Sequence, residues 1–448
     1  MFADVIVDIT ASEVDRIFEY SFIDENIKTG SRVLVPFGGK KICGIVVSVK
    51  EFSVYPPEKI KPIASVLDDV PALSEECFSL MRFMQKKYFV SAASALRLFL
   101  PSEMRLGRVK ELFINYIYLA VSKEEALSFK NVLKITAKQQ KNAIDFFIEN
   151  NRAKSADVSK TFGRSAIVAL IEKGILKSVS EKASRSPYNG LALNDKDITL
   201  TNYQTEAINS INLTDKQVTL LHGVTGSGKT EVYLNLINST IKSGKTAIML
   251  VPEIALTPQM LKQLRARFGD NAAILHSGLS TGERFDEWWR IRNGEAKIVI
   301  GARSAIFAPV ENLGLVIIDE EHDSSYQSEQ SPRYKTLDIA VFRANYNNAK
   351  IVLGSATPSI ETYLLATSNV YNLVTMPERI NKKPLPEVLI ADMKREVRRG
   401  NSTMFSSILR EELSNCLKNN KQAILFLNQR GYSKSVICTE CGHVHKCD

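Results

Sequence analysis

The second half of the chain alternates between short apolar runs and stretches in which apolar residues have helical spacing. Short runs with little polar alternation are typical of parallel strands that are buried on both faces. These runs lie at residues 218–221, 246–251, 272–275, 298–300, 315–318 and 351–353. Residues 198–380 are therefore predicted to form an α/β lobe with a parallel sheet, and residues 381–448, with a further run at 423–427, the start of a second lobe.

Residues 1–105 have a strand pattern instead. Apolar residues alternate between turns that contain glycine and proline, and Ser74 is placed to cap a helix that continues towards Tyr88. The alternating segments lie at residues 4–8, 31–38 and 43–49. This part of the chain is predicted to be a small β-rich domain.

A third pattern lies between these two parts. Three short helices and a strand-like segment are predicted at residues 137–149, from Ser155 onward, at 165–172 and at 174–177. That order is typical of a winged helix, which is predicted for residues 106–180, followed by a linker at 181–197. A winged helix either contacts DNA or only packs against its neighbours, and the sequence leaves both open.

Composition agrees with a folded protein of several domains. The chain has 448 residues, of which 44% are hydrophobic and 24% charged, and a length of about 150 residues per domain suggests roughly three domains. No apolar run approaches about 18 residues, and the N-terminus lacks a basic region before an apolar one, so a cytoplasmic location without a membrane is expected. The formal net charge of +9 favours a polyanionic partner, although solubility explains a mild excess almost as well.

The apolar run at 218–221 leads directly into a phosphate loop of the form G-x-x-x-x-G-K-T. Glycines let backbone N–H groups turn towards phosphate oxygens, and the helix that follows directs its positive end at the anion. Lys229 is expected to reach the β- and γ-phosphates, and Thr230 to bind Mg²⁺. The predicted ATP-binding residues are Gly223, Val224, Thr225, Gly226, Ser227, Gly228, Lys229 and Thr230.

A second nucleotide signature follows the apolar run at 315–318. Asp319 is expected to hold Mg²⁺ through water, and Glu320 to orient and deprotonate the attacking water. Acidic residues after a strand are common, but here they belong to the same predicted sheet as the phosphate loop. Lys229, Thr230, Asp319 and Glu320 are therefore the predicted catalytic residues.

The order of signatures resembles that of superfamily 2 helicases and translocases, which have RecA-like lobes. Residues 200–204, upstream of the phosphate loop, resemble the superfamily element whose glutamine recognises adenine, and Gln204 is the matching residue. An amide side chain suits this role because the edge of adenine presents a hydrogen-bond donor beside an acceptor. Segments 251–259 and 301–305 resemble motifs that contact the DNA backbone, with Thr257 and Arg303 as expected contacts. Each segment taken alone could be an ordinary loop, but their order argues against that alternative.

The segment at 354–359 resembles motif III of the same superfamily, which couples hydrolysis to movement. The resemblance implies that the hydroxyls of Ser355 and Thr357 bond near the end of the Asp319 strand, and that His322 belongs to the same coupling group.

The resemblance narrows to the PriA replication-restart helicases, also called primosomal protein N′. The segments that carry it lie at 223–233, 251–259, 319–322 and 427–432, and the resemblance spans essentially the whole chain. It implies an ATP-dependent helicase that moves 3′ to 5′, recognises stalled or repaired replication forks and initiates primosome assembly. Implied partners are forked and single-stranded DNA, primosome proteins and single-stranded DNA-binding protein, with a monomer expected.

The family also implies a pocket for the 3′ end of a nascent strand. The matching residues are Phe18, Glu19, Tyr20, Gly38 and Lys61, where an aromatic ring stacks on a base, a carboxylate accepts from the 3′-hydroxyl and a lysine meets a phosphate. The family usually has aspartate at the position of Glu19. The alternative is that Phe18 and Tyr20 belong to the core of the domain.

Segment 323–334 resembles the aromatic-rich loop of the family. Tyr326, Arg333 and Tyr334 are its expected DNA contacts, with the two rings stacked on single-stranded bases and reporting DNA occupancy to the ATP site. Trp288 and Trp289 are instead expected to be helix packing.

Three of the six cysteines, Cys438, Cys441 and Cys447, crowd the end of the sequence. A C-x-x-C pair is half of a zinc site, which His443 and His445 could complete, or the module continues beyond the chain. The resemblance implies two zinc ions, an insertion in the second lobe, and an arginine finger that lies past the end. We therefore expect this chain alone to bind DNA and to unwind nothing.

Two other functions are alternatives. The chain could be another superfamily 2 translocase, of the fork-reversal or restriction type, but these lack a 3′-end domain. It could also be a DNA-binding scaffold with a vestigial nucleotide site, which the presence of Lys229, Asp319 and Glu320 opposes.

Overall fold

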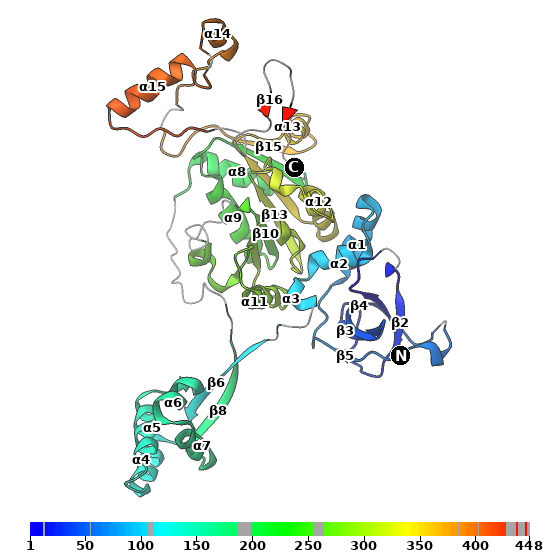
Figure 1. Cartoon of the computed structure of the whole chain (residues 1–448), viewed down its shortest axis with the longest axis vertical. Coiled ribbons are helices and arrows are strands. Elements are labelled where there is room, and N and C mark those ends of the chain that lie inside the picture. The colour runs from blue at the N-terminus through cyan, green and yellow to red at the C-terminus, as the bar shows by residue number, and fades with distance from the viewer. Residues whose placement is uncertain are drawn as a thin grey trace. The chain divides into compact units, whose positions relative to one another are not determined.

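The structure is a computed structural model with two compact units, Met1–Lys382 and Lys383–Asp448 (Figure 1). It describes residues 1–11, 14–53, 55–105, 109, 111–183, 185, 199–253, 264–382, 386–401, 403–426, 436–437 and 444–445.

The N-terminal part is a five-stranded antiparallel sheet in the order β2-β1-β4-β3-β5. The predicted alternating segments fall on β1, β3 and β4. The strands are β1 Phe2–Val7, β2 Phe18–Ser21, β3 Arg32–Phe37, β4 Lys40–Lys50 and β5 Ser65–Val66. Helices α1 Glu75–Tyr88, α2 Ala92–Phe99 and α3 Ser102–Arg105 follow, and Ser74 is the N-cap residue of α1, although its hydroxyl makes no capping hydrogen bond.

The next module combines a three-stranded antiparallel sheet, ordered β7-β6-β8, with four helices packed on it. The strands are β6 Leu112–Leu119, β7 Arg152–Lys154 and β8 Leu176–Ala183, and the helices are α4 Lys123–Val132, α5 Lys138–Glu149, α6 Ser155–Phe162 and α7 Arg164–Glu172. Ser155 is the first residue of α6 and not its cap, because β7 pairs with β6 and holds Lys154 extended as the N-cap. Strand β8 continues to Ala183, past the predicted boundary at residue 180.

The predicted α/β lobe is confirmed as a seven-stranded parallel sheet in the order β11-β12-β10-β13-β14-β9-β15 (Figure 1). Its edge strand β15 was not predicted, because its residues alternate between exposed and buried and form no continuous apolar run. The strands are β9 Val218–Gly223, β10 Thr246–Leu250, β11 Ala272–Leu275, β12 Ile298–Gly301, β13 Leu313–Asp319, β14 Lys350–Ser355 and β15 Asn372–Met376.

Helices cover both faces of this sheet, which explains why its central strands are apolar throughout. On β13, Leu315 and Ile317 pack against α8 and α9, whereas Val316 and Ile318 belong to the cluster of α11 and α12. The helices are α8 Asn202–Leu213, α9 Lys229–Lys242, α11 Thr281–Arg292, α12 Thr336–Asn347 and α13 Ile360–Thr367, with short 3-10 helices η4 Gly269–Asn271, η5 Arg303–Phe307 and η6 Ser324–Tyr326. A further 3-10 helix, η2 Pro57–Lys59, lies between β4 and β5 in the N-terminal part.

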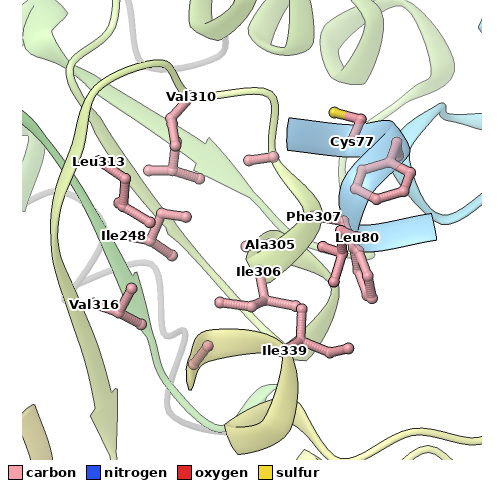
Figure 2. Close-up of a cluster of buried hydrophobic side chains, with 14 of the residues drawn as sticks. Cys77, Leu80, Ile248, Ala305, Ile306, Phe307, Val310, Leu313, Val316 and Ile339 are labelled. Atoms are coloured by element: carbon pink, nitrogen blue, oxygen red, sulfur yellow. The ribbon is translucent and has the colours of Figure 1, made fainter. Parts of the chain in front are cut away.

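One apolar cluster joins the N-terminal helices to the lobe. Figure 2 shows Leu80 of α1 beside Phe307 of η5, within the cluster that also holds Ile339 of α12. Trp288 is buried as the packing interpretation expects, and its Nε1 donates to the backbone oxygen of Phe99 at 2.8 Å. This contact makes α2 part of the same core as α11.

The second unit contains α14 Met393–Arg398, α15 Ser407–Lys418 and the paired strands β16 Val436–Ile437 and β17 Val444–His445. The strand predicted at 423–427 is wrong for residues 423–426, which have no regular structure. Ile424 and Phe426 are 96% and 85% exposed, and no described strand pairs with them, so a ladder of hydrogen bonds is missing. Of the helices described in either unit, none is long and apolar enough to cross a bilayer.

Candidate nucleotide site and DNA-binding surfaces

Three neighbouring strands bring the predicted catalytic residues to one edge of the parallel sheet. In the register of the sheet, Asp319 of β13 lies beside Gly354 of β14, and Ser355 of β14 lies beside His222 of β9. The carboxyl ends of parallel strands lie at the same edge, where open α/β sheets bind ligands. The phosphate loop, the two carboxylates and the segment after β14 therefore meet there.

The phosphate loop has a backbone that requires glycine. Gly226 and Gly228 have φ values of +82° and +85°, and a Cβ on Gly228 would lie 2.4 Å from Nε2 of Gln204. Helix α9 begins at the next residue, so its free N–H groups face the loop. The hydroxyl of Ser227 is buried without a hydrogen-bond partner, which fits a loop that is completed by an anion.

Lys229 lies inside this loop. Its side chain is almost fully buried, and Nζ donates to the backbone oxygen of Gly223 at 2.9 Å. Phosphate oxygens are stronger acceptors for an ammonium group than a neutral carbonyl. Thr230, the next residue, is exposed at the helix start. Both predicted side chains are thus placed where a bound triphosphate would reach them.

The carboxylate of Asp319 is held by Tyr233, a residue for which the sequence motifs predict no role. The hydroxyl of Tyr233 donates to Oδ1 of Asp319 at 2.9 Å. Burial raises the pKa of Asp319, while the Tyr233 hydrogen bond and the Lys229 charge act in the opposite direction. Burial also raises the pKa of Tyr233 well above its ordinary value, so the hydroxyl remains a donor. The sequence contains one signal for this role, since Tyr233 lies four residues after Lys229 on α9. Residues four apart share one face of a helix, so both side chains lie on the same face of α9.

Gly354 provides the space for this hydrogen bond. A Cβ at that position would lie 1.6 Å from the hydroxyl oxygen of Tyr233 and 3.3 Å from Oδ1 of Asp319. The partly buried carboxylate of Asp319 has a raised pKa, and Thr230 offers an exposed hydroxyl at the start of α9. This donor set suits a divalent cation, whose charge keeps a carboxylate ionised. The residues predicted to hold Mg²⁺ therefore fit that role.

A second group of polar side chains surrounds His322, between Glu320 and the segment after β14. Glu320 has a φ of +47°, a left-handed conformation that is uncommon for glutamate and often found at functional sites. Nδ1 of His322 lies 3.7 Å from Oε2 of Glu320 and 2.8 Å from Oγ of Ser355. Oγ1 of Thr357 lies 3.4 Å from Nε2 of His322. The predicted coupling residues are thus brought together around the histidine ring.

Gln204 is placed differently from the prediction. Its side chain is 2% exposed, its Oε1 accepts from the backbone N–H of Thr201 at 2.8 Å, and its Nε2 donates to the backbone oxygen of Gly228 at 3.3 Å. Both ends of the amide are therefore bonded within the protein in this arrangement. Its observed contacts cap α8 and hold the phosphate loop, and do not present a free edge to adenine.

The aromatic-rich loop also departs from the prediction. Tyr326 and Tyr334 are each 5% exposed, because Tyr334 packs edge-on against Phe307 at 5.1 Å and Tyr326 is covered by the lobe. Their rings therefore offer no stacking surface to a base in this arrangement. The hydroxyl of Tyr326 donates to the backbone oxygen of Asp319 at 2.7 Å, which joins the loop directly to the nucleotide site.

The two predicted arginine contacts of this region differ in exposure and partners. Arg303 donates through Nη1 to the backbone oxygens of Ser325 and Gln327, so it ties the loop to the lobe. Arg333 is exposed, with only Nε bonded to the backbone oxygen of Glu329.

Some predicted site residues lie outside the described residues. They are Thr257 and the three zinc candidates Cys438, Cys441 and Cys447. Within the described part of the chain, no group of three or more potential metal ligands occurs.

The predicted 3′-end residues occupy one region of the N-terminal sheet. Phe18 is half-buried and packs edge-on against Phe37 at 5.0 Å, next to the exposed turn residue Gly38. Exposed Lys61 accepts a backbone hydrogen bond from Ser21, so it lies beside the end of β2. These positions are compatible with a single binding surface.

Tyr20 and Glu19, which are neighbours on β2, differ in their surroundings. Tyr20 is 4% exposed and its hydroxyl donates to the backbone oxygen of Pro36 at 3.4 Å, so it belongs to the core, as the alternative expected. Glu19 is different, because its buried Oε1 has no hydrogen-bond partner. Its Oε2 lies 3.9 Å from Nζ of Lys50. An acceptor of this kind is suited to a ligand hydroxyl.

The parallel sheet, phosphate loop and paired carboxylates define a RecA-like helicase lobe, and residues 201–365 match the model of DEAD/DEAH box helicases. Residues 4–101 match the model of the PriA 3′DNA-binding domain. The chain belongs to the PriA family of replication restart proteins.

Relatives named replication restart protein PriA match along nearly the whole chain. The protein of Bacillus subtilis is 38% identical, over 100% of this chain and 64% of its own length. Those of Synechocystis and Haemophilus influenzae are each 32% identical, over 99% and 98% of this chain and 63% and 60% of their own lengths. The chain therefore spans less than two thirds of the length of these relatives.

Proposed function

We propose that the protein is an ATP-dependent DNA helicase of replication restart. In this proposal it binds stalled or repaired forks, moves 3′ to 5′ and initiates primosome assembly in the cytoplasm as a monomer. The observation that carries the proposal is the meeting of Lys229, Asp319 and Glu320 at one sheet edge, in a chain that also matches a 3′DNA-binding domain. Unwinding is proposed for the whole protein, since the chain spans only part of its relatives.

Lys229 and Thr230 would bind the triphosphate in this mechanism. Lys229 exchanges the carbonyl of Gly223 for phosphate oxygens, and the N–H groups at the start of α9 bind the same anion. Thr230 and Asp319 would hold Mg²⁺, which neutralises charge on the phosphates when it is bound. Tyr233 keeps the Asp319 carboxylate oriented towards that position.

Glu320 would orient and deprotonate the attacking water. Its side chain is 39% exposed, so water reaches it, and its left-handed backbone turns it away from the strand direction of β13. His322 lies between this carboxylate and the hydroxyls of Ser355 and Thr357. A change at the γ-phosphate is thereby transmitted to the segment after β14.

Tyr326 supports coupling to DNA by a different route from base stacking. Its hydrogen bond to the backbone of Asp319 means that a shift of the aromatic-rich loop also moves the metal-binding strand end. Exposed Arg333 is the side chain of this loop that remains available for a DNA phosphate. We propose that DNA contact at Arg333 reaches the ATP site through Tyr326.

The finer expectations from the family remain part of the proposal. We propose that the module of α5, α6, α7 and β8 is a winged helix, and that the C-terminal cysteines belong to a module with two zinc ions. Proposed partners are forked and single-stranded DNA, primosome proteins and single-stranded DNA-binding protein. Of the alternatives, another type of translocase is disfavoured by the 3′DNA-binding domain match, and a vestigial scaffold by the assembled nucleotide site.

Wild-type protein is expected to bind forks with a 3′-hydroxyl about 10-fold better than forks with a 3′-phosphate. The unpaired Oε1 of Glu19 accepts a hydrogen bond from the hydroxyl but repels a phosphate dianion. Glu19→Gln should reduce this discrimination mainly by improving binding of the phosphate-ended fork. Fluorescence anisotropy with the two forks measures the ratio of dissociation constants.

Glu25→Gln is the matched control, because Glu25 is exposed in the turn after β2. It should keep the wild-type ratio. Equal affinity of wild-type protein for both forks would remove Glu19 from 3′-end recognition.

A further inference from the structure

A segment after the edge strand of the lobe lies directly against the phosphate loop. Residues 377–381, here called the post-β15 segment, follow Met376. The backbone N–H of Val224 donates to the oxygen of Met376 at 3.1 Å, and that of Ile380 donates to the oxygen of Gly226 at 3.0 Å. Backbone hydrogen bonds at the end of β15 and at Ile380 thus hold this segment against the phosphate loop.

Ile380 anchors the segment more firmly than these bonds alone. A Cβ on Gly228 would lie 2.7 Å from Cδ1 of Ile380, so the side chain packs closely over the glycine. Gln204 bonds the same glycine from α8. The loop is therefore bounded by α8 and by the post-β15 segment, and Arg379 has a defined position beside it.

Arg379 carries a charge that the described protein does not use. Its Cγ lies 4.0 Å from the position of a Cβ on Gly226, and its Nε is buried without a hydrogen-bond partner. No ion pair joins it to a carboxylate among the described residues. A buried, unpaired guanidinium donor is unfavourable, and it is expected where a ligand supplies the acceptor.

We propose that Arg379 is a phosphate-binding residue of the nucleotide site, which contacts the polyphosphate of a bound nucleoside triphosphate. Arginine suits this role because its planar group donates several hydrogen bonds to phosphate oxygens. The unpaired hydroxyl of Ser227 in the same loop points to the same ligand. The inference rests on the proposed ATP-dependent function and adds a binding residue to it.

The test is calorimetric titration of the 448-residue chain with MgATP, ADP and AMP. Arg379→Met should weaken MgATP binding by about 10- to 100-fold, with a smaller loss for ADP and the smallest for AMP. Arg379→Lys should recover part of the affinity. The melting temperature of the nucleotide-free Arg379→Met protein should equal or exceed that of wild type, since a buried unpaired donor has been removed. Arg164→Ala, an exposed arginine on α7, is the control and should bind as wild type.

Four other outcomes are informative. Wild-type affinity in Arg379→Met overturns the inference and leaves the proposed function intact. An equal loss for AMP and MgATP overturns the assignment to phosphates. A lowered melting temperature without rescue by lysine shows a structural role instead. If wild-type protein does not bind MgATP at all, the proposed function falls together with the inference.

Discussion

Lys229→Ala is expected to weaken MgATP binding by about 10- to 100-fold and to abolish DNA-stimulated ATP hydrolysis. Its ammonium group is a buried positive charge within the phosphate loop and donates to the backbone oxygen of Gly223. A charge-assisted hydrogen bond contributes about 1.5–3 kcal/mol, and the transition state for phosphoryl transfer has more charge for it to stabilise. Titration of the chain with MgATP measures the binding loss, and phosphate release in the full-length protein measures the hydrolysis.

A second effect of the same substitution is electrostatic. The Lys229 charge opposes the rise in the pKa of Asp319 that burial causes, so removing it lets that pKa rise further. The carboxyl group then stays protonated to a higher pH, and Mg²⁺ binding should weaken most at low pH. Wild-type protein should show a smaller dependence of MgATP affinity on pH than the variant.

Lys242→Ala is the matched control for Lys229→Ala. Lys242 ends the same helix and is exposed, so its loss should leave nucleotide binding unchanged. Fork binding should persist in both variants, because the candidate 3′-end residues lie on a separate sheet. Normal hydrolysis by Lys229→Ala would refute the assignment of the motor, and equal losses in both variants would indicate damage to α9.

The α/β lobe could be predicted because its signals are local. Central strands covered on both faces are apolar at every position, as in Leu315 to Ile318, and the motif residues follow the strand ends directly. Strand β15 was missed because an edge strand alternates, as in Leu373, Val374 and Thr375. The run that includes Ile424 looked like a strand, but strand formation depends on a neighbour that no local pattern reveals.

The site shows the same division between local and tertiary information. The roles of Lys229 and Asp319 depend on backbone features encoded within a few residues of each. The positions of Tyr326 and Tyr334 depend on burial against η5 and β13, which brings aromatic side chains into the core although their loop reads as polar. No sequence motif marks Arg379. It lies near the phosphate loop only because β15 pairs with β9 and brings the residues after β15 to that loop.

Arg343→Ala is expected to lower the free energy of unfolding by about 3–5 kcal/mol, the largest stability effect that we predict. Arg343 of α12 is 3% exposed, and its Nε donates to Oε1 of Glu76 on α1 at 2.6 Å. Its Nη1 also donates to the backbone oxygens of Ile306 and Ala308, at 2.7 and 2.9 Å. Its Nη2 donates to the backbone oxygen of Val310 at 3.5 Å. Alanine removes the partner of a buried carboxylate and of these three carbonyls, at the place where α1 meets the lobe.

Urea denaturation followed by tryptophan fluorescence measures this effect at the contact between the N-terminal helices and the lobe. The chain has two tryptophans, Trp288 and Trp289, both on α11, and Trp288 bonds to the backbone of Phe99 in the N-terminal domain. Their emission should change when the N-terminal helices separate from the lobe. Arg343→Ala should therefore shift the fluorescence midpoint to lower urea.

The exposed pair between Lys87 and Asp338 is the matched control, because it joins the same two helices at 2.8 Å with Lys87 43% exposed. Lys87→Ala should lower the free energy of unfolding by at most about 1 kcal/mol, since water solvates both charges when the pair is broken.

The double variant Arg343→Met with Glu76→Gln should recover part of the stability that Arg343→Ala loses, because no unpaired charge stays buried. If Arg343→Ala costs no more than Lys87→Ala, the stability of the contact resides in the apolar cluster around Leu80 and Phe307 and not in the buried pair.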